Sequence, residues 1–430
     1  MHDPQALLDS GEEAVARMCR RGHSLDLTTL GELTRLRRRT VDAVGRLRAE
    51  SNQLARAGRD RGRSGGVAQA EVRTRARELK ERIQQTEAEH RLVCAELDGV
   101  LLAIPNLPAD DIPDGNSAAE AVELYRVGAP PVFDFPARHH AEIGELTGVL
   151  DMRRAVRLSG ARFAVARGQG AALGRALAAF FLDVHTREHG YTEYAVPSLV
   201  SRETMTGTGQ LPKFEQELFR TRVGDRDLYL IPTGEVPLTS LHAGEILDAA
   251  ELPLALTGHT PCFRSEAGSY GRDTRGILRL HEFAKVELVR ICAPEQSDQE
   301  LALLLGHAEE LLRRLGLAYR VVVLPAGDIG FSARKTFDIE VWLPSQEDYR
   351  EISSCSDCGT FQARRARIRI RDRRGATGFA ATLNGSGLPV GRTVAAILEQ
   401  YQRPDGSVTV PDVLVPYLGG QRLIEITPRP

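Results

Sequence analysis

The stretch FRSEAGSYGRDTRG, residues 263–276, combines arginines, an acid and glycines in a short segment. Its arginines are Arg264, Arg272 and Arg275, and Glu266 lies two residues after the first of them. Arginine binds carboxylates and phosphates through a planar fork of N–H donors, and glycine lets a backbone approach a ligand closely. The stretch therefore predicts a loop that grips an anion. A solvated surface turn is the alternative.

A hydroxyl and a carboxylate stand two residues apart in LIPTGEVPLTSL, residues 230–241, at Thr233 and Glu235. On a β-strand, residues i and i+2 face the same side, so the two groups would project together. Such a pair suits an ammonium group on a small polar substrate. A solvent-facing sheet edge would show the same pattern.

The segment RLHEFAKVELVR, residues 279–290, alternates in a way that is typical of a strand. One face would carry Arg279, His281, Phe283, Lys285 and Glu287. An arginine and an aromatic ring on one face could sandwich a flat base by stacking and cation–π contact. A charged face on a half-buried sheet is the alternative.

A carboxylate lies beside hydroxyls in YREISSCSDC, residues 349–358, at Glu351, Ser353 and Ser354. Oxygen ligands of this kind suit Mg²⁺ shared with a phosphate, although the pattern has low specificity. The same segment holds the C-x-x-C pair Cys355 and Cys358. Without a second pair at a suitable spacing, this pair is weak evidence for zinc.

A further turn-like segment, TLNGSGLPVGRT at residues 382–393, holds Asn384, Ser386 and Arg392. Its glycines and single arginine precede the apolar run 394–398, which predicts a helix. This pattern again indicates a turn set against an anion.

The segments together hold several arginines, a few acids and one carboxylate that could bind a metal. None shows an evident Ser-His-Asp set, and the sequence has neither a P-loop nor a dinucleotide-binding glycine motif. Phosphoryl or nucleotidyl transfer needs no protein nucleophile, only positioning and electrostatic stabilisation. The residues therefore favour an enzyme that holds ATP and a carboxylate so that the carboxylate attacks the α-phosphate.

The composition is that of an ordinary globular chain, with 430 residues, 42% hydrophobic and 27% charged. This length predicts two or three domains. No apolar run has the length of a membrane span, and the first residues lack a signal pattern, so we expect a cytoplasmic protein without a membrane partner. Six scattered cysteines argue against a disulfide framework.

Positive charge is concentrated in residues 35–82. This region carries fourteen arginines and one lysine against six acids, a balance of +9, whereas the whole chain has a net charge of −2. The remainder is therefore about −11. Such asymmetry favours a polyanion partner such as nucleic acid over a merely solvated helix face.

Apolar residues in the N-terminal quarter follow the alternating four-three spacing of a coiled coil. The clearer seam is Val72, Ala76, Leu79, Ile83, Thr86, His90, Val93, Leu97, Val100 and Ile104. The weaker one is Leu30, Leu33, Arg37, Thr40, Val44, Leu47, Ser51 and Leu54. Glycines in 55–66 should end the first helix and reverse the chain, which predicts an antiparallel helical hairpin.

Beyond the proline-rich segment 104–116, strand-like runs alternate with helical ones without a strict βαβ rhythm. The strand-like runs include 227–232, 320–325 and 367–372, and a helix is expected over 171–189. This texture predicts an antiparallel α+β domain.

The sequence closely resembles the bacterial seryl-tRNA synthetases, which are class II aminoacyl-tRNA synthetases. The matching motifs include TGTGQLPKFE, the Thr-x-Glu at 233–235, the 263–276 stretch, KVEL, REISSCS and TLNGSGL, in that order along the chain. The resemblance implies a class II antiparallel β-sheet domain with flanking helices over residues 111–430. It also implies a tRNA-binding domain with a coiled-coil arm over residues 1–110.

The resemblance also assigns roles to single residues. Arg264, Glu287 and Arg392 would be catalytic. Serine would be bound by Thr233, Gly234, Glu235, Arg264, Glu287, Asn384 and Ser386. ATP would be bound by Arg264, Ser265, Glu266, Arg279, Leu280, Phe283, Glu351, Ile352, Ser353, Ser354 and Arg392. Mg²⁺ would be held by Glu351 and Ser354.

The implied reaction joins L-serine to ATP, giving seryl-adenylate, and then transfers the seryl group to tRNA(Ser), and also to tRNA(Sec). The long variable arm of the tRNA would contact the helical arm through Arg35, Arg38, Arg46, Arg56, Arg61, Arg73 and Arg77. Pro197 would lie at the interface of a homodimer.

Four departures from the family pattern bear on how adenylate analogues bind: Gly234, Glu282, the pair Gly258-His259, and Tyr270. They leave room for a second synthetase copy devoted to antibiotic self-resistance or to supplying seryl-tRNA for biosynthesis. A serine-activating homologue with a non-tRNA acceptor and a non-catalytic RNA-binding homologue are further alternatives. The basic arm disfavours the former, and the intact ligand set disfavours the latter.

Overall fold

The computed structural model describes residues 1–60, 67–267 and 275–427. The chain forms two compact units, Met1–Cys19 with His23–Pro105, and Arg20–Gly22 with Asn106–Pro430. Among the described residues, no helix is both long enough and apolar enough to span a bilayer.

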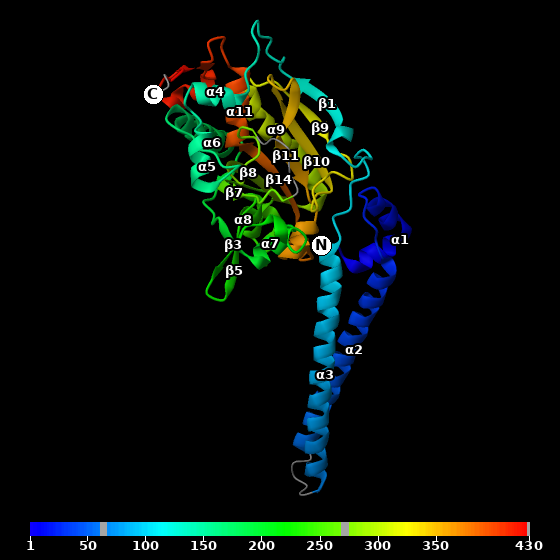
Figure 1. The fold of residues 1–430 in the computed structure, drawn as a ribbon. Helices are drawn as coiled ribbons and strands as arrows, with labels where there is room; N and C mark the ends of the chain where they lie inside the picture. The colour runs from blue at the N-terminus through cyan, green and yellow to red at the C-terminus, as the bar shows by residue number, and fades with distance from the viewer. Residues whose placement is uncertain (61–66, 268–274, 428–430) are drawn as a thin grey trace. The chain divides into compact units, whose positions relative to one another are not determined.

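The first unit is helical, with α1 (Pro4–Cys19), α2 (Leu27–Asp60) and α3 (Val67–Ala103) (Figure 1). Three side-chain pairs join α2 to α3: Thr40 with His90 at 2.9 Å, Arg48 with Glu87 at 2.7 Å, and Glu50 with Arg75 at 2.8 Å. Residue numbers rise along one helix as they fall along the other, so the two helices are antiparallel. The predicted hairpin is confirmed.

Most of the predicted seam is at least partly buried. Its buried members are Leu30, Leu33, Thr40, Leu47, Leu79, Val93, Leu97 and Ile104, and the last of these follows the end of α3. Arg37 and Ala76, which were predicted on the seam, are exposed. A long cation such as Arg37 can pack its methylenes on the helix while its head stays in water, and Ala76 is too short to reach across. Gly58 does not end the first helix, because α2 continues to Asp60.

The second unit is built on an eight-stranded sheet in the order β1-β9-β10-β11-β14-β8-β7-β2. The strands are β1 (Val122–Val127), β9 (Tyr319–Val323), β10 (Lys335–Leu343), β11 (Asp348–Asp357), β14 (Ala381–Pro389), β8 (Glu282–Cys292), β7 (Leu254–Phe263) and β2 (Thr192–Glu193). All neighbours pair antiparallel except β2 and β7. The predicted α+β class with an antiparallel sheet is confirmed.

Three long helices supply the core beside this sheet: α6 (Gln169–Arg187), α9 (Ser297–Arg314) and α11 (Val390–Gln400) (Figure 1). The predicted apolar side of α6 is buried, at Leu173, Leu177, Phe180, Phe181 and Val184. Burial of this stripe against the sheet is the main source of stability for an amphipathic helix. The helix starts and ends two residues before the predicted 171–189.

Smaller elements surround the sheet. Two three-stranded sheets are formed by β3 (Leu199–Ser201), β5 (Arg226–Leu230) and β4 (Arg220–Val223), and by β13 (Thr377–Phe379), β12 (Arg369–Arg371) and β6 (Ile246–Asp248). The strand β15 (Val408–Thr409) pairs with β16 (Leu423–Ile424). The shorter helices are α4 (His140–Leu146), α5 (Met152–Ser159), α7 (Arg202–Thr208), α8 (Glu235–Ser240) and α10 (Phe361–Ala366). The predicted strands at 227–232, 320–325 and 367–372 correspond to β5, β9 and β12.

Candidate active site

A cavity of about 570 Å³ opens over β8, β11 and β14. Ten of the predicted site residues line it: Thr233, Glu235, Arg264, Glu266, Arg279, Glu287, Glu351, Ser354, Asn384 and Ser386. A smaller cavity shares Arg264, Glu266 and Glu351 with it and adds Leu280, Phe283, Ile352 and Arg392. The fold therefore brings segments more than a hundred residues apart into one continuous site.

One end of the cavity holds a buried polar network around Glu287. The Thr233 hydroxyl donates to Glu287 Oε2 at 2.6 Å, and Lys285 Nζ donates to Thr233 Oγ1 at 3.0 Å. Lys285 and Glu287 also form a close ion pair, and both are at least nine-tenths buried. They lie two apart on β8 and so face the same side, as the alternating pattern predicted. A ligand hydroxyl in this pocket would meet acceptors and donors already oriented by one another.

From their spacing we predicted that Thr233 and Glu235 lie on a strand. This prediction is wrong. β5 ends at Leu230, Gly234 is the residue before α8, and Glu235 is the first residue of that helix. Both side chains still line the cavity because the turn into a helix, rather than strand alternation, aims them there.

Glu235 lies next to this network and is held by two amides. Gln362 Nε2 donates to Glu235 Oε1 at 2.6 Å and Asn384 Nδ2 donates to the same oxygen at 2.9 Å. Burial, followed by the nearby charge of Glu287, raises the pKa of Glu235 to about 7. A ligand ammonium would stabilise the ionised carboxylate, which is the form that can bind it.

Gly234 does not line the cavity, and its role is one of space. A Cβ at this position would lie 3.0 Å from Glu287 Cβ and 3.1 Å from Thr260 Oγ1. Glycine therefore lets the turn approach β8 and β7 closely at the base of the pocket.

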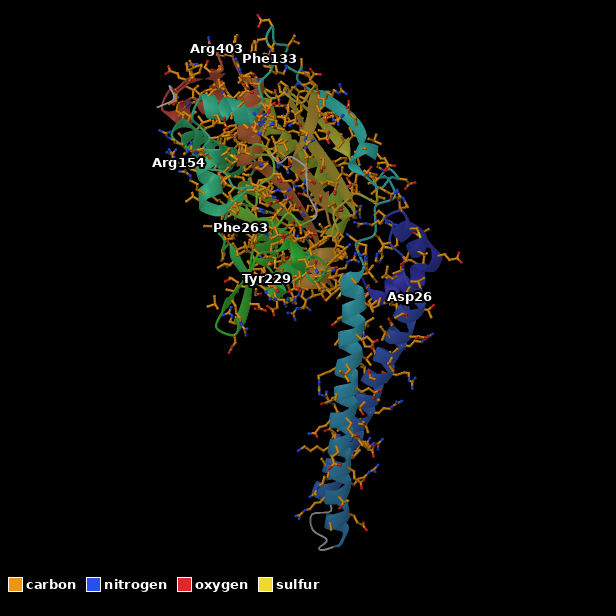
Figure 2. All side chains as sticks on the ribbon, viewed as in Figure 1. Asp26, Phe133, Arg154, Tyr229, Phe263 and Arg403 are labelled. Atoms are coloured by element: carbon orange, nitrogen blue, oxygen red, sulfur yellow. The ribbon has the colours of Figure 1, made fainter. Side chains whose placement is uncertain are left out.

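The arginine stretch begins directly after Phe263, the last residue of β7, labelled in Figure 2. The Arg264 guanidinium lies 5.2 Å from the centre of the Phe283 ring, and its Nε donates to the Pro232 carbonyl at 3.2 Å. Arg279 forms an ion pair with Glu266. Arg275 is exposed and lines neither cavity. Arg272 and Tyr270 lie outside the described residues.

Arg392, in α11, connects three walls of the site. Its Nη1 donates to the Glu351 carboxylate at 3.0 Å and to the Glu351 carbonyl at 2.8 Å, and its Nε donates to the Leu278 carbonyl at 3.2 Å. The Arg392 charge lowers the pKa of Glu351. Arg264, Phe283 and Arg392 thus surround a pocket that could hold a flat base and its phosphates.

Glu351 and Ser354 face the same cavity across a β-bulge. Ile339 pairs with Ser353 and Glu340 pairs with Glu351, which leaves Ile352 as the extra residue of β11. Nearby, Asp338 is buried, and its Oδ1 has no hydrogen-bond partner among the described residues. Burial and the charge of Glu351 raise the pKa of Asp338 well above its usual range. A carboxylate, a hydroxyl and an unsatisfied acid oxygen form an oxygen-rich environment that fits Mg²⁺.

Two predicted ATP-binding side chains point elsewhere. The Ser353 hydroxyl is buried and donates to the Ser386 carbonyl at 2.7 Å, and the Ser265 hydroxyl donates to the Gln216 carbonyl at 3.2 Å. Neither residue lines the cavities. Any contact from them to a ligand would have to come from the backbone.

Sequence reasoning assigned no ligand role to Lys285 and missed Gln362. Gln362 Oε1 accepts from the Thr382 hydroxyl at 2.7 Å, which orients its amide toward Glu235. Lys285 begins the matched motif KVEL. Gln362 lies in FQARR, residues 361–365, which also matches the family, and these matches were the available signal. Cys355 and Cys358 are buried free thiols whose pKa values are raised by burial, which disfavours zinc binding.

The arginines that were predicted to bind tRNA line neither of the two cavities. Arg35, Arg38, Arg46, Arg56, Arg73 and Arg77 are exposed on α2 and α3. Arg61 lies outside the described residues.

Comparison with known proteins shows the family of the chain. Residues 1–108 match the model of the seryl-tRNA synthetase N-terminal domain, and residues 214–401 match that of the class II core domain for G, H, P, S and T. The chain is 60% identical to serine–tRNA ligase 2 of Streptomyces avermitilis over 99% of both chains. It is 51% identical to a serine–tRNA ligase of Syntrophotalea carbinolica over 98% of this chain and 99% of that one.

A solved structure shows the same fold over the full length. The seryl-tRNA synthetase from Pyrococcus horikoshii, complexed with ATP, superposes with a TM-score of 0.88 at 34% identity, covering 100% of both chains. The chain therefore belongs to the seryl-tRNA synthetases, a family of class II aminoacyl-tRNA synthetases.

Proposed function

We propose that this protein activates L-serine with ATP and passes the seryl group to tRNA. The observation that carries the proposal is the juxtaposition of two half-sites in one cavity. The serine half-site suits a small hydroxylated amine and consists of Thr233, Glu235, Lys285 and Glu287. The ATP half-site suits a nucleotide and includes Arg264, Phe283 and Arg392.

The chemistry requires that a carboxylate oxygen of serine attack the α-phosphorus while pyrophosphate leaves. Glu235 would hold the ammonium, and Glu287 and Thr233 would hold the side-chain hydroxyl. Arg264, whose guanidinium borders both half-sites, would bind the serine carboxylate and the α-phosphate together. Holding both groups this way supplies orientation and charge stabilisation without a protein nucleophile.

We propose that Mg²⁺ serves with ATP and is held by Glu351 and Ser354. When bound, the cation would neutralise phosphate charge. Glu266 would contact the adenine edge, with Phe283 stacked on the ring.

Serine selectivity follows from the buried acceptor. Alanine would leave the Glu287 and Lys285 network without its ligand hydroxyl, and unpaired buried polar groups discriminate strongly. The test is ATP–pyrophosphate exchange with serine, alanine, threonine and cysteine, followed by charging of tRNA. Exchange with serine alone and subsequent charging are expected, whereas no exchange with any amino acid would contradict the proposal.

For the acceptor, we propose tRNA(Ser) and tRNA(Sec), bound by residues 1–110 through the long variable arm, with residues 111–430 catalysing both steps. The support is the set of exposed arginines on α2 and α3. We further propose that the protein acts in the cytoplasm, because charging requires access to the tRNA pool. By its resemblance to the family, we also propose a homodimer with Pro197 at its interface.

A second candidate is a specialised copy for antibiotic self-resistance or biosynthetic supply of seryl-tRNA. It is supported by the name of the relative at 60% identity, serine–tRNA ligase 2. A non-hydrolysable seryl-adenylate mimic tests it. Weak inhibition is expected of a resistance copy, and inhibition in the nanomolar range would contradict that role.

A further inference from the structure

A buried histidine outside the cavities connects two walls of the ATP half-site. His140 is fully buried at the start of α4, and its Nδ1 lies 2.6 Å from Glu399 Oε1. Its Nε2 lies 3.2 Å from the backbone nitrogen of Ile277. Ile277 directly follows the arginine–glycine stretch, and Glu399 belongs to α11.

The bonding partners fix the state of the imidazole ring. A backbone N–H can only donate, so His140 Nε2 must accept and carries no proton. Nδ1 then carries the ring proton and donates it to Glu399. The ring is therefore a neutral tautomer with both nitrogens satisfied.

His139, His140 and Glu399 also form a group that could by composition hold a metal ion. The hydrogen bonds argue against that role. His139 Nδ1 accepts from the Ala141 amide at 3.2 Å, and Glu399 Oε2 accepts from the Ser345 amide at 3.0 Å. Both ring nitrogens of His140 and both carboxylate oxygens of Glu399 are therefore engaged by the protein itself.

The backbone on the other side of the ring is adapted to this contact. Gly276 has φ +85°, and a Cβ there would lie 2.0 Å from His140 Nε2. Only glycine allows the backbone at the end of segment 263–276 to lie this close to the imidazole.

The residues after this contact form a wall of the ATP half-site. Ile277, Leu278, Arg279 and Leu280 all line the smaller cavity. Arg392 donates to the Leu278 carbonyl at 3.2 Å, one residue beyond the amide that His140 accepts. Arg392 and Glu399 are seven residues apart on α11, about two turns, and so share a helix face.

We infer that His140 is a positioning residue for ATP binding. Together with Arg392 it fixes the wall 277–280 to α11 at two consecutive residues, one directly and one through Glu399. Without the His140 contact, the wall would keep one of its two hydrogen-bonded connections to α11, and the backbone at Ile277 would be less firmly held. The inference rests on the proposed ATP site.

Two substitutions separate the two halves of this bridge. His140→Asn keeps a donor where Nδ1 stands and so retains the bond to Glu399, but it loses the acceptor for Ile277. His140→Gln places an amide oxygen where Nε2 stands and so retains an acceptor for Ile277. It loses the side-chain donor to Glu399, but the backbone N–H of residue 140, which donates to Glu399 Oε1 at 3.1 Å, still connects this residue to α11. The matched controls are His185→Asn and His185→Gln, because His185 is also fully buried but lines neither cavity.

The experiment measures KM and kcat for ATP and for serine by pyrophosphate exchange. It also measures amide hydrogen exchange across 276–281, at a temperature where thermal unfolding shows every variant folded. For His140→Asn we expect the KM for ATP to rise about tenfold, because the loss of one buried hydrogen bond has about that effect. The KM for serine should not change. Exchange at 276–281 should also become faster. His140→Gln should stay near the wild type, as should both His185 variants.

Equal effects of Asn and Gln, or parallel changes in both KM values that follow the melting temperature, would overturn the inference and leave a purely structural histidine. A wild-type protein that shows no ATP–pyrophosphate exchange would instead overturn the proposed function. In that case, unchanged amide exchange at 276–281 in His140→Asn would still refute the bridge.

Discussion

Glu351 and Ser354 lie three residues apart on one strand, and both side chains face the same cavity because β11 carries a bulge at Ile352. A regular strand would send residues i and i+3 to opposite faces. The bulge thus assembles the carboxylate and hydroxyl oxygens that suit a divalent cation beside the guanidinium of Arg392.

Metal dependence should follow this arrangement. We expect chelation of Mg²⁺ to abolish pyrophosphate exchange and Ser354→Ala to raise the Mg²⁺ concentration needed for half-maximal rate. Ser353→Ala is the matched control, since that hydroxyl is bonded to the Ser386 carbonyl away from the cavity. Equal Mg²⁺ requirements in the two variants would refute the assignment.

Replacement of the buried acid should affect both binding and stability. Glu287→Gln weakens the charged acceptor for the serine hydroxyl, and we expect kcat/KM for serine to fall roughly a hundredfold. It also leaves the buried Lys285 ammonium without its counter-ion, which should lower the free energy of unfolding by about 3 kcal/mol. Exchange kinetics and denaturant unfolding measure the two effects. Thr233→Ser, which keeps the hydroxyl, should show neither.

Serine binding should depend on pH through Glu235. Its pKa of about 7 means that the free site is increasingly protonated below neutrality, and a protonated acid cannot pair with an ammonium. The KM for serine should therefore rise as pH falls through 7, by up to tenfold per pH unit. A profile of kcat/KM for serine that stays flat between pH 6 and 8 would contradict this (the range being about one unit either side of the pKa).

The same pKa predicts a stability effect of opposite sense. Because the folded-state pKa lies above the unfolded value of 4.5, the fold binds the proton more tightly, and stability falls as pH rises from 4.5 to 7. Glu235→Gln removes this penalty, so we expect its melting temperature to exceed that of the wild type above pH 7 and to lose the advantage near pH 4.5. Melting curves across that range test the sign.

The space at Gly234 should limit substitution. Gly234→Ala places a methyl group 3.0 Å from Glu287 Cβ and 3.1 Å from Thr260 Oγ1, so one neighbour must yield. We expect a raised KM for serine and a loss of about 1 kcal/mol of stability. Adding Thr260→Ala removes one of the two crowded atoms and should restore part of both. If the double variant is no better than the single one, crowding against Thr260 is not the cause.

The helical arm should affect charging and leave activation alone. Substitution of Arg35, Arg38, Arg73 and Arg77 by alanine should raise the KM for tRNA and reduce the salt dependence of charging, by about one unit of slope per lost phosphate contact. Pyrophosphate exchange should not change. Arg153→Ala with Arg157→Ala, two exposed arginines of α5, is the control. Equal losses of charging in both sets would point to general charge effects.

Local patterns in the chain are enough to predict the fold class, the hairpin and several residues that line the cavity. Period-two and four-three patterns reflect which faces are buried, so α6, β9 and the apolar seams of α2 and α3 could be predicted from local chemistry. The residue types at Arg264 and Arg392 indicate anion binding by their chemistry alone, whereas the role of Glu287 in hydroxyl binding is implied by the family resemblance.

How those residues meet depends on tertiary packing. Strand alternation predicted the wrong local structure for Thr233 and Glu235, because the turn into α8 depends on packing against β8. The bulge at Ile352 is set by pairing with β10. Gln362 and His140 act through partners more than a hundred residues away. Such long-range contacts are fixed when the sheet and α11 pack together, and no local pattern in the chain encodes them.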